Sequence, residues 1–209
     1  MHLSIDHLCS PYPGEPAAGD GILVMANPET TFFGIIDVLG HGAAAARVAD
    51  ETRRHFEELE TRTSLGWTDA GVDQVLRALH EALHRTRGAA LTLCRAHASG
   101  LSVAGVGNVG LRTAPGRDLG LHCVPGVLGR RMPKLRVARM ATPPGTRVVL
   151  HSDGIRGDFE FDGTNGEAGS QLCERLMREH RRVHDDATVM VVDFLAQTVD
   201  ERSAEVPDE

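Results

Sequence analysis

Apolar residues recur along this chain with two periods, and the change from one period to the other marks the predicted elements. Two apolar runs, 21–26 and 30–40, flank the turn-forming sequence Asn-Pro-Glu-Thr, and they predict two strands joined as a hairpin. After Gly42, apolar side chains recur at helical intervals as far as Leu59. That spacing predicts an amphipathic helix.

Helical spacing returns from Val72 to Leu83, with Asp69 placed to cap the start of this helix and Gly88 to close its end. Beyond it, short apolar runs alternate with turns rich in Gly and Pro, which predicts an antiparallel meander. Its expected strands are 89–97, 100–107, 109–114, 119–124, 134–141 and 146–154. An acidic Gly-rich loop, a third helix and a last strand follow at 157–169, 171–181 and 187–196.

The order of these elements favours an α+β fold built of layers. Helices and antiparallel strands are segregated along the chain, which differs from the alternation of a doubly wound fold. No internal repeat or linker divides the sequence, so residues 1–196 are expected to form one domain. The segment 197–209 is acidic and aperiodic, and we expect it to be a disordered tail.

Composition excludes several classes of protein. The 209 residues are 41% hydrophobic and 24% charged, as in globular domains. A formal net charge of −7 argues against a nucleic-acid partner that depends on phosphate neutralisation. There is no apolar run long enough to span a membrane and no signal sequence, so we expect a soluble, cytoplasmic protein without a membrane partner. The four cysteines lie far apart in the sequence, which indicates reduced thiols rather than a zinc site.

Acidic residues stand at the ends of predicted strands or in the adjoining turns. They are Asp20, Asp37, Asp153 and the pair Asp185-Asp186. Carboxylates gathered at strand ends repel one another unless a cation lies between them, and hard cations such as Mg²⁺ or Mn²⁺ prefer oxygen ligands. Each position alone is typical of an ordinary turn. Together they indicate a dinuclear site with oxygen ligands.

Four motifs carry a resemblance to a known family. In order and spacing, Asp20, DVLGHG at 37–42, SDG at 152–154 and DDAT at 185–188 resemble the metal-dependent Ser/Thr protein phosphatases of type 2C, in their bacterial sporulation and stress-response branch. The stretches RGAALTL, GVGNVGLR, PGVLGRRMPK and PPGTRVVLHSDGI look like the short, sensor-less stressosome phosphatases of the RsbX type. The resemblance covers about residues 19–195.

The resemblance implies a four-layer αββα sandwich of two antiparallel sheets, with two Mn²⁺ or Mg²⁺ ions between them at one end. Asp37 would bridge the two ions, Asp153 and Asp185 would hold one of them, and Asp20 would act directly or through water. Residue 38 would offer its backbone carbonyl, and Asp186 is a secondary candidate ligand. A pair of ions lowers the pKa of a shared water and clamps phosphoryl oxygens. The implied nucleophile is therefore a hydroxide held by Asp37, Asp153 and Asp185 through the metals.

Two positions depart from the family's pattern. Val38 stands where the family commonly has Gly, which permits backbone angles that a β-branched residue resists. Asn108 in Gly107–Gly110 stands where the broad family has an Asp linked to a third metal. Because Asn is a neutral and weaker ligand, we do not predict a third metal.

Further polar residues have two interpretations each. His41, just before a helix N-terminus, is either a neutral structural residue, which the helix dipole favours, or a proton donor to the leaving alkoxide. His151 is interpreted as a strand residue. The basic run either attracts a phosphoprotein or is a solvated face; it comprises Arg130, Arg131, Lys134, Arg136 and Arg139.

These observations predict a phosphoprotein phosphatase acting on phosphoserine or phosphothreonine. By resemblance, its substrates are phosphorylated STAS-domain proteins of a stressosome, so that hydrolysis would reset stress signalling. One alternative is an anti-anti-sigma factor phosphatase in another partner-switching pathway. A second alternative, favoured by Val38 and Asn108, is a catalytically weak pseudo-phosphatase that binds its partner as a regulatory module.

Overall fold

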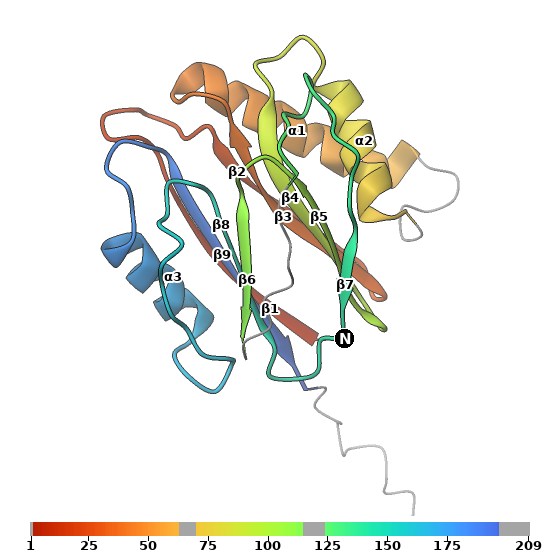
Figure 1. Ribbon diagram of the computed structural model, residues 1–209, viewed down its shortest axis with the longest axis vertical. Helices are drawn as coiled ribbons and strands as arrows, with labels where there is room; N and C mark the ends of the chain where they lie inside the picture. The colour runs from red at the N-terminus through yellow and green to blue at the C-terminus, as the bar shows by residue number, and fades with distance from the viewer. Residues whose placement is uncertain (1, 63–69, 115–123, 197–209) are drawn as a thin grey trace, which may run out of the picture.

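Two antiparallel sheets stack face to face, and helices cover their outer faces (Figure 1). The computed structural model describes residues 2–62, 70–114 and 124–196. One sheet has the strand order β1-β9-β8-β6 and the other β2-β3-β4-β5-β7. The strands are β1 (His2–Ser10), β2 (Asp20–Ala26), β3 (Thr30–Val38), β4 (Ala89–His97), β5 (Gly100–Val106), β6 (Gly110–Ala114), β7 (Ala138–Met140), β8 (Arg147–His151) and β9 (Ala187–Leu195).

Side chains alternate along the strands between two separate apolar layers, because successive residues of a strand point to opposite faces. On β3, Phe33 and Ile35 pack between the sheets against Val148 and Met190 of the other sheet. The neighbouring Phe32 and Ile36 pack against the helices instead. With both faces covered, β3 is buried along nearly its whole length. The predicted four-layer α+β sandwich is thus confirmed.

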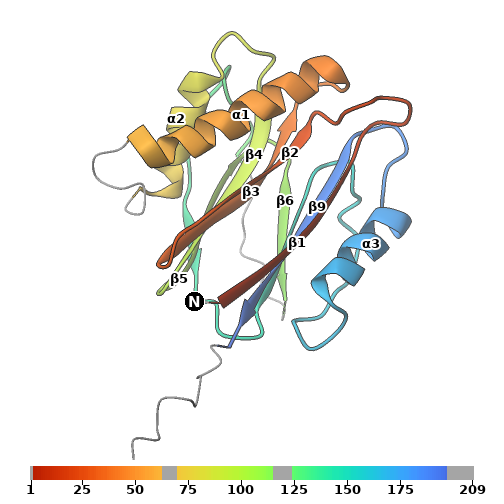
Figure 2. The ribbon, with the colours of Figure 1, turned by 180° about the vertical axis from the view of Figure 1, so that it is seen from behind.

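Within the described residues, three helices form the two outer layers. The first two, α1 (Ala43–Arg62) and α2 (Val72–Ala82), cover the β2–β7 sheet, and α3 (Gly169–Glu179) covers β1 and β9. Figure 2 shows α1 and α3 on opposite sides of the paired sheets. The N-cap of α2 is Gly71, and the predicted cap Asp69 lies outside the described residues.

The first strand was not predicted. The apolar Leu3 and Ile5 alternate with polar residues, which is the period of a strand, but the run is short and polar on balance. In the structure β1 pairs with β9 along its whole length, from His2 opposite Leu195 to Ser10 opposite Ala187.

The predicted meander is wrong in its connectivity. Its strands are divided between the sheets, since β4, β5 and β7 lie in one sheet and β6 and β8 in the other. The chain changes sheet at Gly107, whose φ of 98° suits glycine. Alternation indicates strands but not which sheet each one joins. The predicted strand 134–141 shortens to β7, and of 119–124 only Val124 lies in the described residues, where it forms a bridge with Val106.

No helix in the described ranges combines the length and apolar character needed to cross a membrane. Within the same ranges, Cys9, Cys94 and Cys173 are free thiols, as expected. The predicted tail 197–209 and Cys123 lie outside them.

Candidate metal centre

The hairpin β2–β3 brings two of the predicted acidic residues together. Asp20 begins β2 and lies directly opposite Asp37, near the end of β3, in the antiparallel register. Asp20 is buried and Asp37 half-buried. Val38, the last residue of β3, has an ordinary strand conformation, with its N–H donating to the Gly19 carbonyl at 3.2 Å. A β-branched residue is therefore compatible with this backbone.

The facing sheet supplies the other acidic residues at the same end of the sandwich. Asp153 follows β8 and Asp185 precedes β9, and these strands are antiparallel neighbours, so the end of one meets the start of the other. Gly154 makes this approach possible. A Cβ at Gly154 would overlap the backbone carbonyl of Asp186, so the glycine of the SDG motif lets the two segments touch.

The carboxylates act on one another electrostatically. Burial, together with the charges of the neighbouring carboxylates, raises the pKa of Asp37 to about 8. Burial likewise raises the pKa of Asp20 to about 7. The pKa of Asp185 is also raised, first by burial and then by Asp153. Such a set of charges is unfavourable without a compensating cation.

A buried oxygen without a partner supports the same conclusion. Asp20 is 7% exposed, and its Oδ2 atom has no hydrogen-bond partner among the described residues. Buried polar atoms in native proteins are normally paired. An all-oxygen donor set from Asp20, Asp37, Asp153 and Asp185 fits Mg²⁺ or Mn²⁺.

Asp186 has a different environment from Asp185. Its Oδ1 accepts a hydrogen bond from the Tyr12 N–H at 2.7 Å, and its Oδ2 accepts one from the Gly19 N–H, also at 2.7 Å. The residue is 4% exposed. Both oxygens thus hold the β1–β2 loop, which leads into Asp20. Asp185 is half-buried, and its Oδ1 accepts a hydrogen bond from the N–H of Asp186 at 3.0 Å.

Asn108 contacts the carboxylate cluster. It lies between β5 and β6, and its Nδ2 donates to Oδ2 of Asp153 at 2.6 Å. A neutral amide here orients a carboxylate by a hydrogen bond, whereas an Asp would add a further negative charge. The motif comparison identified this position, but sequence spacing did not predict its contact with Asp153.

His41 is held by two residues that sequence reasoning missed. Its ring stacks on Tyr12 with the centroids 4.4 Å apart, and its Nδ1 lies 3.2 Å from Oε1 of Glu15. A carboxylate only accepts, so Nδ1 carries the proton. The only sequence signal for Tyr12 and Glu15 is an aromatic and an acidic residue in a Pro- and Gly-rich loop. His151 ends β8 as predicted; it is buried, and burial lowers its pKa.

A second group of possible ligands lies at the C-terminal end of α2 and in the turn that follows it. His80, Glu81 and His84 place one ligand atom each within 4.8 Å of one another. However, the Gly129 N–H donates to His80 Nδ1 at 2.9 Å, and burial lowers the pKa of His80. In a neutral ring whose Nδ1 accepts, Nε2 carries the proton. Neither nitrogen then offers a lone pair to a cation, so this group fits a structural role.

Comparison with known proteins identifies relatives of this chain. The model of the family described as Stage II sporulation protein E (SpoIIE) matches residues 27–195. No curated protein sequence matches.

Solved structures share the fold over nearly the whole chain. A chain from a structure described as "The bacterial stressosome: a modular system that has been adapted to control secondary messenger signaling" is 26% identical, with a TM-score of 0.79, over 92% of this chain and 100% of that one. RsbX in complex with magnesium is 16% identical, with a TM-score of 0.74, over 92% of this chain and 95% of its own. The Mycobacterium tuberculosis serine/threonine phosphatase PstP/Ppp is 16% identical, with a TM-score of 0.68, over 93% of this chain and 99% of its own.

Proposed function

Because the chain belongs to the SpoIIE family of PP2C-type phosphatase domains, we propose that it hydrolyses phosphoserine or phosphothreonine on a protein substrate with the help of Mn²⁺ or Mg²⁺. One observation carries the proposal. Carboxylates from two facing sheets converge at one end of the sandwich, and a buried oxygen of Asp20 there lacks a hydrogen-bond partner among the described residues. The likeness to an RsbX structure that contains magnesium supports a divalent cation.

Four aspartates would hold a pair of ions. Asp37, Asp153 and Asp185 would be the carboxylate ligands of the ions, and Asp20 would act directly or through water. The backbone carbonyl of Val38 would be a further oxygen ligand. When bound, the ions supply the positive charge that makes water a nucleophile and that neutralises the phosphoryl oxygens.

Other residues of the site position these ligands. Asn108 fixes the rotamer of Asp153 by its hydrogen bond of 2.6 Å. Asp186, a secondary candidate ligand by sequence, holds the backbone of Tyr12 and Gly19 and so places Asp20. We therefore assign Asp186 a positioning role.

His41 is the candidate for delivering a proton to the leaving serine oxygen. Glu15 fixes its Nδ1–H, which leaves Nε2 as the atom able to exchange a proton with the substrate. A pH profile of turnover tests this role with His41→Gln. Loss of the alkaline limb supports proton donation, whereas an unchanged profile with a lower melting temperature shows that the ring only packs on Tyr12.

We propose phosphorylated STAS-domain proteins of a stressosome as the substrates. The support is the likeness to a chain of a bacterial stressosome structure and to RsbX. An anti-anti-sigma factor of another partner-switching pathway is the alternative substrate of the same site. Side-by-side turnover of the two phosphoproteins separates them.

The enzyme proposal is tested with purified protein and a phosphorylated STAS domain. EDTA should abolish phosphate release, and Mn²⁺ or Mg²⁺ should restore it in the wild-type protein but not in Asp37→Asn. Full turnover in excess chelator would contradict the metal mechanism. No turnover at any metal concentration, combined with retained binding of the phosphoprotein, would instead support the pseudo-phosphatase.

A further inference from the structure

Four arginines, together called the basic surface, lie on two segments that are far apart in the sequence but joined in the structure. Arg85 and Arg87 are in the turn between α2 and β4, and Arg130 and Arg131 follow Val127. The segments are joined by backbone hydrogen bonds between Ala89 and Leu128, at 2.9 and 3.3 Å. Ala89 is also the register partner of Val38, the neighbour of Asp37. Strand β4 therefore lies between the segment of Arg130 and Arg131 and strand β3, which carries Asp37.

Arg87 contacts the loop of the metal centre directly. Its Nη1 donates to the Leu39 carbonyl at 3.0 Å, and Gly40 leaves room for it, because a Cβ there would lie 2.8 Å from Nη1. A guanidinium has five N–H donors. Within the described residues this is the only hydrogen bond recorded for the Arg87 side chain, so its other donors can receive an anion.

The charges of the basic surface are not neutralised inside the protein. Arg147 and Arg175 pair with carboxylates, whereas the four arginines of the surface take part in no ion pair among the described residues. In the part of the chain that the structure describes, the Arg130 side chain donates one hydrogen bond, to the carbonyl of Thr86 at 3.5 Å. This cluster is a local exception in a chain whose formal net charge is −7.

The backbone of Arg85 is an independent indication. Its φ is 72°, a left-handed conformation that usually holds glycine after a helix. A side chain with a Cβ is strained there, and such strain is concentrated at functional positions. The exposed Arg85 side chain thus adds a cation beside Arg87 at an energetic cost that glycine would avoid.

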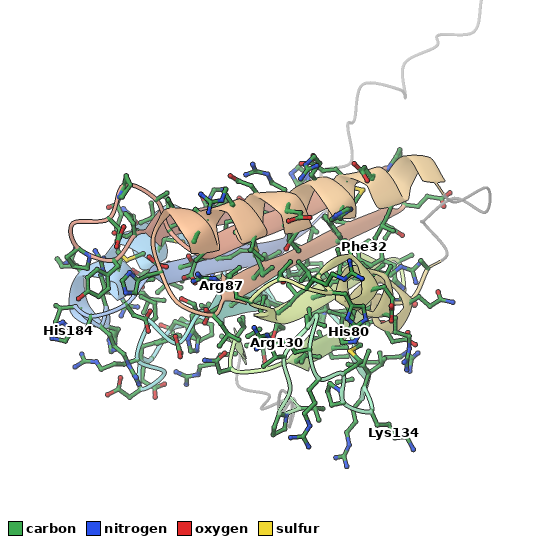
Figure 3. All side chains as sticks on the ribbon, turned by 90° about the horizontal axis from the view of Figure 1, so that it is seen from above. Phe32, His80, Arg87, Arg130, Lys134 and His184 are labelled. Atoms are coloured by element: carbon green, nitrogen blue, oxygen red, sulfur yellow. The ribbon has the colours of Figure 1, made fainter. Side chains whose placement is uncertain are left out.

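Arg139, the last cation of the basic run, lies elsewhere. Arg139 on β7 is opposite Ser102, in the half of β5 that is distant from the metal centre. In the view of Figure 3, Arg87 lies between His184 and Arg130, and Lys134 projects further outward. The sequence groups these cations in one run, but the structure separates them into two places.

We propose, on the basis of the function above, that Arg85, Arg87, Arg130 and Arg131 form a docking surface for acidic residues that flank the phosphorylated residue of the protein substrate. The fork of a guanidinium matches a carboxylate with two parallel hydrogen bonds. Because the surface is exposed, its attraction acts mainly on association and is screened by salt.

Three probes test the docking surface. The first two are phosphoserine peptides with three residues on each side of the phosphoserine. The flanking residues are all Asp in one peptide and all Asn in the other. The third probe is p-nitrophenyl phosphate. The variant Arg87→Gln/Arg130→Gln removes two charges from the surface. The control Arg139→Gln removes a charge of the run from β7, opposite Ser102 and distant from the metal centre.

With Mn²⁺ at low ionic strength, the wild-type protein should prefer the Asp-flanked peptide by about tenfold in kcat/KM, a modest value for electrostatic steering. The preference should disappear in Arg87→Gln/Arg130→Gln, should remain in the control and should fall with added NaCl. Equal losses on the peptides and on p-nitrophenyl phosphate would overturn the proposal, as would a preference that survives in the variant. If Arg87→Gln disturbs the Leu39 loop, the exposed pair Arg130→Gln/Arg131→Gln gives the same test.

Failure of the docking proposal is distinguishable from failure of the proposed function. If the wild-type protein hydrolyses none of the three probes and no phosphorylated STAS domain, the phosphatase proposal fails. The two peptides can then be labelled with a fluorophore, and their binding in EDTA can be measured by fluorescence anisotropy, which still tests docking. Tighter binding of the Asp-flanked peptide that is lost in Arg87→Gln/Arg130→Gln supports the surface, and equal binding of both peptides refutes it.

Discussion

Replacing Asp185 and Asp186 in turn by Asn should separate a metal ligand from a structural residue. Both changes remove one negative charge and keep the shape of the side chain. We expect Asp185→Asn to lower metal-dependent turnover by more than about 100-fold, because it removes an anionic ligand from a hard-cation site. Asp186→Asn should remain responsive to Mn²⁺ but be less stable.

The stability cost follows from the two hydrogen bonds of Asp186, each 2.7 Å long. A carboxamide has one acceptor oxygen instead of two, so either the Tyr12 or the Gly19 N–H loses its partner. An unsatisfied buried donor costs about 1 to 3 kcal/mol. Relief of repulsion with Asp20 and Asp37 offsets part of this cost. We expect a net loss of about 2 kcal/mol and a fall in Tm of about 4 to 8 °C.

Asp185→Asn should behave in the opposite way in the metal-free protein. The pKa of Asp185 is raised by burial and by Asp153, so its charged form is disfavoured in the native state. A neutral side chain should therefore leave Tm unchanged or raise it. The assay is thermal unfolding in EDTA together with turnover against Mn²⁺ concentration. If Asp186→Asn loses its Mn²⁺ response while Asp185→Asn keeps it, the ligand is Asp186 and the assignment is wrong by one residue.

Three further predictions concern pH, the core and the SDG motif. Because the native pKa values of Asp20 and Asp37 are raised to about 7 and about 8, the metal-free native state retains protons that the unfolded chain releases near its ordinary pKa of about 4. The free energy of unfolding, measured with urea in EDTA, should therefore fall as pH rises from about 4 to 8, and a flat profile would contradict these shifts. Arg147 is 1% exposed and makes a bidentate ion pair with Asp193. Arg147→Met should therefore lower the free energy of unfolding, measured with urea, by about 3 to 5 kcal/mol. A loss below about 1 kcal/mol would show that the pair behaves as an exposed one. Gly154→Ala should abolish Mn²⁺-dependent turnover in a protein that circular dichroism shows to be folded, since its Cβ would collide with the carbonyl of Asp186; wild-type turnover would refute the need for this close approach.

Local pattern predicted the parts of the fold and site that depend on neighbours in the sequence. The predicted hairpin placed Asp20 and Asp37 at the ends of neighbouring strands, and Asp153 and Asp185 also stand at strand ends. These four residues could therefore be named from the sequence alone, without knowledge of their positions in space. The pairing of β1 with β9 was missed, because a partner more than 170 residues away leaves no period in the sequence.

The positioning contacts of the site were missed for a similar reason. The hydrogen bonds of Asp186 to backbone N–H groups depend on the path of a loop, and adjacent acids look equivalent in a motif. The contact of Arg87 with Leu39 joins two turns that have no common pattern. These contacts arise from tertiary packing, which periodicity does not record.

The pairing of β1 with β9 has a consequence for biosynthesis. A chain still emerging from the ribosome has made β1, β2 and Asp20 long before β9 and Asp185 exist. Until β9 is available, β1 has no neighbour in its sheet, and the aspartates from the second sheet are not in place. Pairings between distant segments are also the slow steps of folding. We therefore expect nascent chains to be inactive until β9 has been made and pairs with β1.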